Sequence, residues 1–229
     1  MLSFPKMGVW GNLFPHLIFG FGLGRTIAEE SMTEAAVEWV DWIDIYGHTL
    51  ATLPRSTIRG RNLLHRVSAT LVFRPDGRVF VQQRHPQKDV YPGLHDMFVG
   101  GTVISGEDFA ANACREIAEE LGVRGVPVYR LFGHDFADAV TRSRIGVFAC
   151  VYEGPITLQP EEVVAGTWCD ESGVDRLIDE GLVCPDSVQG WRGYLHRFGR
   201  GANFSSDAAP GLEPIDCASH LSDPNDTMS

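Results

Sequence analysis

Residues 100–123 read GGTVISGEDFAANACREIAEELGV, and this stretch predicts one amphipathic helix. Ser105, followed three residues later by Asp108, has the spacing of a capping box, which places Glu107 and Asp108 in the first turn. Gly122 is the residue type at which helices commonly end. Between these ends, the apolar residues that recur at helical spacing predict a buried stripe: Ala110, Ala113, Cys114, Ile117 and Leu121.

Three glutamates lie on another face of the same expected helix. Glu116, Glu119 and Glu120 stand at positions i, i+3 and i+4, so their carboxylates are neighbours. Like charges at these spacings weaken a helix by roughly a few tenths of a kcal/mol per pair, and only Arg115 is near enough to offset them. A divalent cation that prefers oxygen ligands, such as Mg²⁺, would neutralise the cluster. The alternative is a solvated acidic face, which the three glutamates taken alone would favour.

The spacing of the whole stretch separates these alternatives. Gly101 is followed after five residues by Glu107, and after seven more by REIAEELG at residues 115–122. This pattern resembles the Nudix box, which the sequence matches at every defined position. The resemblance implies the Nudix α/β/α sandwich, an α/β fold with a mixed sheet flanked by helices. It also implies Mg²⁺-dependent hydrolysis, with Mn²⁺ as a substitute, of a diphosphate linked to another group, often a nucleoside diphosphate.

The resemblance further implies roles for particular residues. The expected metal ligands are Glu116, Glu119, Glu120 and the main-chain carbonyl of Gly100. Arg115 and Glu107 match a supporting ion pair that orients these ligands. Gly101 is expected to let the backbone approach the metal closely, because glycine has no side chain.

The general base that would accept a proton from the attacking water is left open among several carboxylates. The candidates are Glu116, Glu119, Glu161 and Glu162. The last two lie in LQPEEVVAGTW, residues 158–168, ahead of an expected strand where some Nudix enzymes carry a second acidic residue. A solvated loop is the alternative for these two. The expected catalytic set is Arg115, Glu116, Glu119 and Glu162.

Two basic residues lie just before the glutamate helix in QQRHPQKDVYPGLHD, residues 82–96. Arg84 and Lys88 are candidates for phosphate binding through charge-assisted hydrogen bonds. A solvated loop explains the same two residues equally well. The substrate we expect is a small-molecule diphosphate.

A second resemblance concerns the branch of the family. HRVSATLVF at residues 65–73, followed by the box, also resembles isopentenyl-diphosphate isomerases, and His65 matches one of their metal-binding histidines. Those enzymes carry a catalytic cysteine and a ligand histidine where this chain has Gly100 and Thr102. Their paired acidic residues are also missing from TRSRIGVF, residues 141–148. A hydrolase is therefore the leading interpretation, with an isomerase or a non-catalytic nucleotide-binding module as alternatives.

Composition excludes some partners. The 229 residues carry a formal net charge of −11, which argues against binding a nucleic acid polymer. The five cysteines include no C-x-x-C, so we expect no disulfide framework or zinc site and a cytoplasmic location. Residues 7–24 are apolar but interrupted by glycine, proline, asparagine and histidine, so we expect no membrane association. The sequence leaves a homodimer open.

Hydrophobic patterning outlines the rest of the chain. Alternation predicts strands at 39–46, 67–73, 79–84, 128–136 and 145–152 and around Trp168. Helices are expected at 171–180 and 185–198. We therefore predict a poorly ordered extension over residues 1–34, a Nudix hydrolase domain over 35–200 and a disordered tail over 201–229.

Overall fold

The structure, a computed structural model, describes residues 37–201, 204 and 211–221. All of them belong to one unit, Val37–Ser229. The predicted extension over residues 1–34 and the apolar run at 7–24 lie outside the described residues. Within the described ranges, none of the helices has the length and apolar character needed to cross a bilayer.

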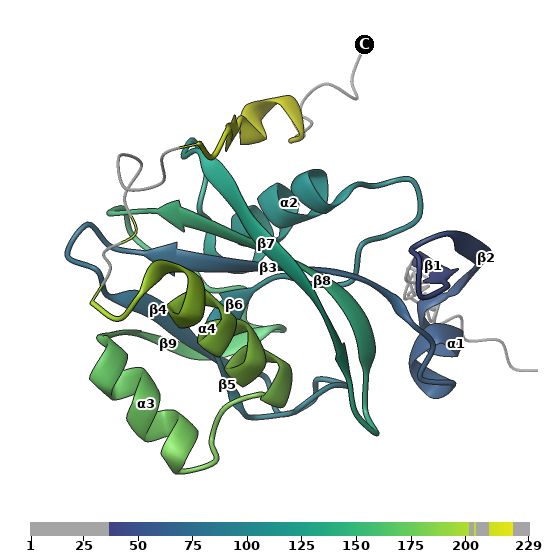
Figure 1. The fold of residues 1–229 in the computed structure, drawn as a ribbon, viewed down its shortest axis with the longest axis horizontal. Coiled ribbons are helices and arrows are strands. Elements are labelled where there is room, and N and C mark those ends of the chain that lie inside the picture. Colours follow the sequence, from purple (N-terminus) through teal and green to yellow (C-terminus); the bar gives the residue numbers. More distant parts are fainter. Residues whose placement is uncertain (1–36, 202–203, 205–210, 222–229) are drawn as a thin grey trace, which may run out of the picture. The chain divides into compact units, whose positions relative to one another are not determined.

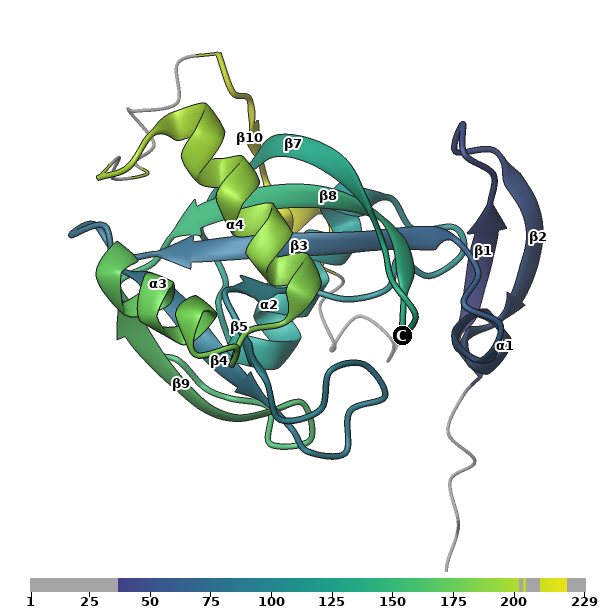
Figure 2. The same ribbon diagram turned by 60° about the horizontal axis from the view of Figure 1, so that its bottom comes forward.

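A mixed sheet forms the centre of this unit, with helices on both of its faces (Figures 1 and 2). The strands are β1 (Trp39–Ile43), β2 (Thr49–Pro54), β3 (His65–Phe73), β4 (Val79–Arg84), β5 (His95–Asp96), β6 (Phe98–Val99), β7 (Val128–Ala137), β8 (Arg142–Val151), β9 (Val163–Cys169) and β10 (Pro214–Ile215). The helices are α1 (Arg55–Gly60), α2 (Phe109–Leu121), α3 (Glu171–Asp179), α4 (Pro185–Phe198) and the short 3-10 helix η1 (Cys217–Ser219).

Strand pairing gives the sheet its mixed character. Its order is β10-β7-β8-β3-β4-β5, with β6 also pairing β3 and β9 also pairing β4. The long central strands β3 and β8 run parallel, from His65 opposite Ser143 to Phe73 opposite Val151. The other pairs in the described sheet are antiparallel, including the β7–β8 hairpin that the sequence predicts.

Alternating side chains on the central strands divide the core into two layers. On β3, Leu71 and Phe73 face the layer that contains Trp191 and Tyr194 of α4. Between them, Val72 faces the opposite layer, where α2 packs. The expected α/β/α sandwich is therefore confirmed, and both helical layers depend on the two-residue period of the strands.

Helix α2 starts later than its sequence predicts. Asp108 is the N-cap, and its side chain accepts a hydrogen bond from the backbone N–H of Ala111 at 2.8 Å. The predicted capping box at Ser105 is wrong, because Ser105 donates its N–H to the carbonyl of Trp39 at 2.8 Å instead. Gly106 then turns the chain with a φ of +89°. At the other end, Gly122 adopts the left-handed conformation that the sequence predicts.

Residues 39–60 form more structure than their sequence predicts. The expected strand at 39–46 ends at Ile43, and a second strand, β2, pairs with it as an antiparallel hairpin. Helix α1 follows directly after Pro54. A bridge between Val40 and Ile104 connects the hairpin to the segment that precedes α2.

The prediction of a disordered tail over residues 201–229 is wrong for its described part. Strand β10 pairs with β7, and Phe204 is buried against Phe73 and Tyr129. Cys217 forms a disulfide with Cys114 of α2, which also contradicts the expectation of no disulfide. The polar composition of the tail predicted disorder because the few residues that anchor it, Phe204, Ile215 and Cys217, are isolated among polar ones.

We expect reduction of this disulfide to destabilise the protein. The bond joins residues 103 positions apart, and closing a loop of that size constrains the unfolded chain, typically by about 2–4 kcal/mol. Thermal melts should show a lower midpoint for Cys217→Ser than for the control Cys169→Ser, whose thiol is free. Thiol titration of the denatured protein should count three thiols before reduction and five after it. Five thiols in protein purified without reductant would contradict the pairing.

Candidate functional site

Helix α2 divides its side chains between the core and an acidic cavity. Ala113, Ile117 and Leu121 are buried against the sheet. The three predicted glutamates line a hollow that we call the glutamate cavity: Glu116, Glu119 and Glu120. Its wall opposite the glutamates includes Glu38, Arg55, Lys88 and Glu162. The structure thus brings the helix and the loop at 158–168 to one place, as the resemblance implies.

The backbone at Gly100 and Gly101 lies close to its neighbours. A Cβ on Gly100 would lie 2.1 Å from the carbonyl oxygen of Ser68, and the φ of Gly100 is +157°, so glycine is required at this position. A Cβ on Gly101 would lie 2.8 Å from the nearest carboxylate oxygen of Glu116 and would displace that side chain. The loop therefore lies directly against the acidic face of α2.

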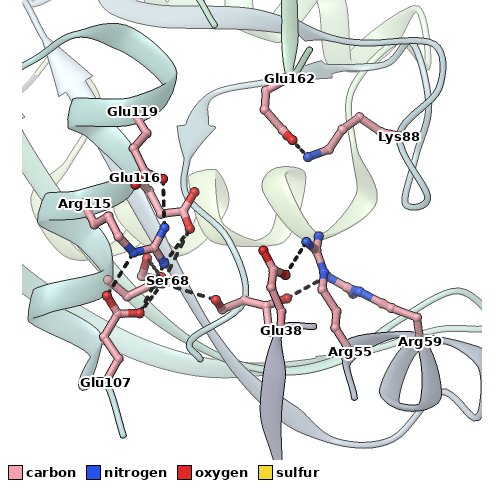
Figure 3. Close-up of polar contacts among 12 residues, drawn as sticks. Glu38, Arg55, Arg59, Ser68, Lys88, Glu107, Arg115, Glu116, Glu119 and Glu162 are labelled. Carbon is pink, nitrogen blue, oxygen red and sulfur yellow. Dashed lines mark hydrogen bonds and ion pairs between the residues drawn. The ribbon is translucent and has the colours of Figure 1, made fainter. Parts of the chain in front are cut away.

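Arg115 is the centre of an ion-pair network on α2 (Figure 3). Its Nε donates to Glu107 at 3.0 Å, and its terminal nitrogens lie 3.0 Å from Glu116 and 2.9 Å from Glu119. Burial opposes the charge of Arg115, but hydrogen bonds to Glu107 and the charges of the other glutamates raise its pKa. The ion pair that the resemblance implies between Arg115 and Glu107 is present, and it also fixes one oxygen of Glu116.

Glu120 is buried and Glu116 is mostly covered, with 14% of its side chain exposed, although both are acidic. Burial is the main cause that raises the pKa of each carboxyl. For Glu120, the charge of Glu116 adds to burial and raises the pKa to about 8, against the lowering effects of Lys88 and Arg84. The amide Nε2 of Gln82 lies 3.4 Å from one oxygen of Glu120. The site therefore resists holding both negative charges by itself.

The donor chemistry of this pair fits a hard cation. Among the described residues, no three acidic, histidine or cysteine side chains converge as a ready set of ligands. Glu119 is half exposed and bonds Arg115, which accounts for its separation from the other two. Mg²⁺ needs only one or two carboxylates because waters and substrate phosphates complete its coordination. Glu116 and Glu120 are two carboxylates of the kind that such a site requires.

The two loop glutamates differ in position. Glu162 lines the glutamate cavity and forms an ion pair with Lys88 (Figure 3). Glu161 is exposed and lines neither this cavity nor the one beside it. Of the two candidates for a second acidic residue, only Glu162 is therefore placed to contact a substrate.

A second hollow, which we call the inner cavity, adjoins the glutamate cavity. The residues that line both are Arg55, Lys88, Gly100, Gly101 and Thr102. Arg84 lines only the inner cavity, where its Nε donates to the carbonyl of Val90 at 3.1 Å. A terminal nitrogen of Arg84 lies 3.7 Å from Asp96. Both predicted phosphate-binding residues, Arg84 and Lys88, thus reach this cavity.

Sequence reasoning missed the contribution of α1 and the residue before β1. Arg55 and Arg59 project from α1 into the inner cavity, and Glu38 accepts a hydrogen bond from Arg55 at 2.8 Å (Figure 3). The signal was present in PRSTIRGR at residues 54–61, where Pro54 can start a helix and two arginines follow at i and i+4 spacing.

His65 is a core residue rather than part of the acidic face of α2. Its side chain is buried, and Nδ1 lies 2.8 Å from the carbonyl oxygen of Leu63. Burial, followed by the positive charge of Arg59, lowers the pKa of His65 to about 4. The histidine is therefore neutral at physiological pH, which supports the structural interpretation of this residue.

Removing the charge of Glu120 should stabilise the metal-free protein, and more so at high pH. The folded protein holds a proton at this carboxyl up to about pH 8, whereas the unfolded chain releases it near the ordinary glutamate pKa of 4.5. The contribution of Glu120 to stability therefore falls as pH rises between these values. Melts in EDTA should show that the gain in stability from Glu120→Gln grows from pH 5 to pH 8. Glu180→Gln, at the exposed C-cap of α3, should show no such trend. An equal gain at both pH values would contradict the assigned protonation.

Comparison with known proteins identifies relatives that share this domain. A family model described as NUDIX domain matches residues 63–181. An uncharacterized Nudix hydrolase of Yersinia pestis is 35% identical over 168 residues, covering 73% of this chain and 91% of the relative. Another from Pseudomonas aeruginosa is 37% identical over 159 residues, covering 69% of this chain and 94% of the relative.

Solved structures share the fold at lower identity. The Deinococcus radiodurans protein DR0079 is 22% identical, with a TM-score of 0.60, and the match covers 68% of this chain and 98% of that one. With the glycine loop, the acidic helix face and the sandwich in place, these matches show that the chain belongs to the Nudix family.

Proposed function

We propose that the chain is a Mg²⁺-dependent hydrolase, active also with Mn²⁺, that cleaves a diphosphate bond in a nucleoside-diphosphate-linked or related small molecule. One observation carries the proposal: two largely covered carboxylates, Glu116 and Glu120, repel each other beside a glycine loop and line a cavity that also contains Arg55 and Lys88. A cation at the carboxylates and a diphosphate beside it would neutralise both sets of charges. A net charge of −11 disfavours a nucleic acid polymer as partner. A cytoplasmic location and a homodimer remain predictions.

Glu116, Glu120 and the carbonyl of Gly100 would hold the cation, with Glu119 as the next available ligand. Bound Mg²⁺ supplies polarisation of a phosphoryl oxygen and acidification of a water. Arg115 keeps Glu116 in one orientation through its contacts with Glu107 and Glu116. The chain thus prepares the ligand geometry before any cation arrives.

The basic residues of the cavity bind and orient the substrate in this proposal. Lys88 is paired with Glu162, and a phosphate would compete with that carboxylate for the ammonium group. Once Lys88 contacts phosphate, Glu162 is free to accept a proton from the attacking water. Glu116 and Glu119 remain the other candidates for the base. Arg84 would contact phosphate from the inner cavity.

The isomerase alternative lacks the thiol it needs. All five cysteines lie in the described part of the chain, and none lines the glutamate cavity or the inner cavity. Gly100 occupies the position of the isomerase cysteine, and close contact with Ser68 leaves no room for a side chain there.

A panel of nucleoside diphosphates, nucleoside-diphosphate sugars and isopentenyl diphosphate, each with Mg²⁺ and with EDTA, tests the proposal. We expect release of phosphate or nucleoside monophosphate with at least one compound, only when the ion is present. Dimethylallyl diphosphate should not form. Its appearance would favour the isomerase, and tight binding without turnover of any compound would favour the nucleotide-binding module.

Glu116→Gln and Glu120→Gln should each lower Mg²⁺-dependent hydrolysis by at least about 10–100-fold, the loss typical even of residues that only support a metal ligand. Each change keeps side-chain size and helix propensity nearly constant while removing one charge. Steady-state kinetics and Mg²⁺ titration of the thermal midpoint are the measurements, because an ion that binds the folded state stabilises it. Glu180→Gln is the matched control. Near-wild-type rates in both variants would show that the acidic face of α2 is only a solvated surface.

A further inference from the structure

The inner cavity contains two arginines that lie outside the matched family domain. Arg55 and Arg59 stand one turn apart on α1, which ends before residue 63, where the family match begins. Both line the inner cavity, and Arg55 also lines the glutamate cavity. Figure 3 shows the two guanidinium groups projecting from α1 on the side opposite the Arg115 network. Their position places positive charge directly beside the acidic face of α2.

Arg59 is largely covered, with 19% of its side chain exposed, and its ion pair is a long one. Among the described residues, the acceptors of its hydrogen bonds are the hydroxyls of Thr102, at 2.9 Å, and Thr141, at 3.2 Å. The carboxylate of Asp89 pairs with Nε at 3.6 Å, beyond hydrogen-bond distance, and it is half exposed. Neutral hydroxyls orient a guanidinium group but do not neutralise it. A closer anion would therefore be favourable at this largely covered charge.

Positive charges gather around the same cavity. Burial, and then the charge of Arg84, lower the pKa of Lys88. Burial lowers the pKa of Arg59, and the charges of Arg55 and Arg84 lower it further against the effect of Asp89. The inner cavity is lined by the basic side chains of Arg55, Arg59, Arg84 and Lys88 and by the acidic ones of Asp89, Asp96 and Asp186. Burial raises the pKa of Asp96 and that of Asp186, the latter to about 7, so the carboxylates do not offset the cluster fully. The cluster is therefore complementary to an anion with more than one charge.

We propose that Arg55 and Arg59 form a subsite for a terminal phosphate, so that this chain acts on monosubstituted diphosphates rather than on diphosphates bridged between two organic groups. The assignment rests on the proposed function for its metal site. It narrows the proposed substrates to the related monosubstituted diphosphates and disfavours nucleoside-diphosphate-linked compounds, in which the diphosphate is bridged. A terminal phosphate carries about two negative charges near neutral pH, and a bridging phosphate carries one. Arg55 lines both cavities and Arg59 lines the inner one, so a phosphate at their boundary would contact Arg55 in competition with Glu38 and would approach Arg59. Two guanidinium groups match the dianion, and the fork of donors on each favours phosphate geometry.

Binding of inorganic phosphate to the metal-free protein tests the subsite without requiring catalysis. Titration calorimetry in EDTA at constant ionic strength, set with KCl, should give a dissociation constant at least about tenfold weaker for Arg59→Met and for Arg55→Met than for wild type, the size of effect expected for a lost charge-assisted contact. Arg59→Lys keeps the charge without the fork and should be intermediate. Arg61→Met removes an exposed arginine just beyond α1 and should bind as wild type does.

Melts of each variant separate loss of binding from loss of fold. Arg55 is one-third exposed, so Arg55→Met tests the subsite even where Arg59→Met unfolds. No phosphate binding by wild type, or equal binding by wild type and by a folded Arg55→Met or Arg59→Met, would overturn the subsite.

A kinetic comparison with Mg²⁺ tests the substrate class. Wild type should show a higher kcat/KM for a nucleoside diphosphate than for a dinucleoside diphosphate, and this preference should shrink about tenfold in Arg55→Met but not in Arg61→Met. Equal rates on both substrates in wild type would overturn the terminal-phosphate assignment. If phosphate binding is lost in the arginine variants while no diphosphate is hydrolysed by wild type, the subsite stands and the proposed hydrolase function fails.

Discussion

Glu116 and Glu120 are held one helical turn apart in a buried position because the opposite face of α2 is fixed in the core. Cys114, Ile117 and Leu121 cannot leave that core without exposing apolar surface, so the helix cannot turn to hydrate the two carboxylates. Burial and mutual repulsion then disfavour the doubly charged state. Packing of α2 thus maintains a repulsion between the two carboxylates that protonation or a bound cation would relieve.

Ion pairs with Arg115 and Lys88 hold the other carboxylates of the site in place despite this repulsion. Arg115 contacts three glutamates at once and holds one oxygen of Glu116, while Lys88 is occupied by Glu162 across the cavity. Among the described residues, neither of these cations forms an ion pair with Glu120, whose side chain accepts a long hydrogen bond of 3.4 Å from Gln82. The described network therefore leaves the most buried glutamate available, and it keeps the positive residues apart from it until a ligand bridges the two sets.

Local sequence predicted the parts of the fold that depend on local spacing. The box, the β7–β8 hairpin, α3 and α4 follow from periodicity and turn residues within short windows. The N-cap at Asp108, the pairing of Cys114 with Cys217 and the burial of Phe204 depend on distant segments that no window contains. At the site, one motif was enough to predict the glutamates. Arg55 and Arg59 could not be predicted in this way, because they reach the site only where α1 packs beside a loop some forty residues later in the chain.

Chemistry and selection occupy different parts of this chain. The acidic helix and its glycine loop lie within the matched residues 63–181 and face one cavity. The inner cavity is closed by side chains from both flanks of that domain, with Arg55 and Arg59 before it and Asp186 after it. The C-terminal flank also anchors α2 through the disulfide between Cys217 and Cys114, whereas Arg55, Arg59 and Asp186 are not among the residues that pack against α2 in the core. Changes at these three positions would therefore alter the inner cavity while leaving the packing that places Glu116 and Glu120 in place. If Arg55 and Arg59 form the proposed phosphate subsite, the residues on α1 would indicate the substrate more directly than the box does.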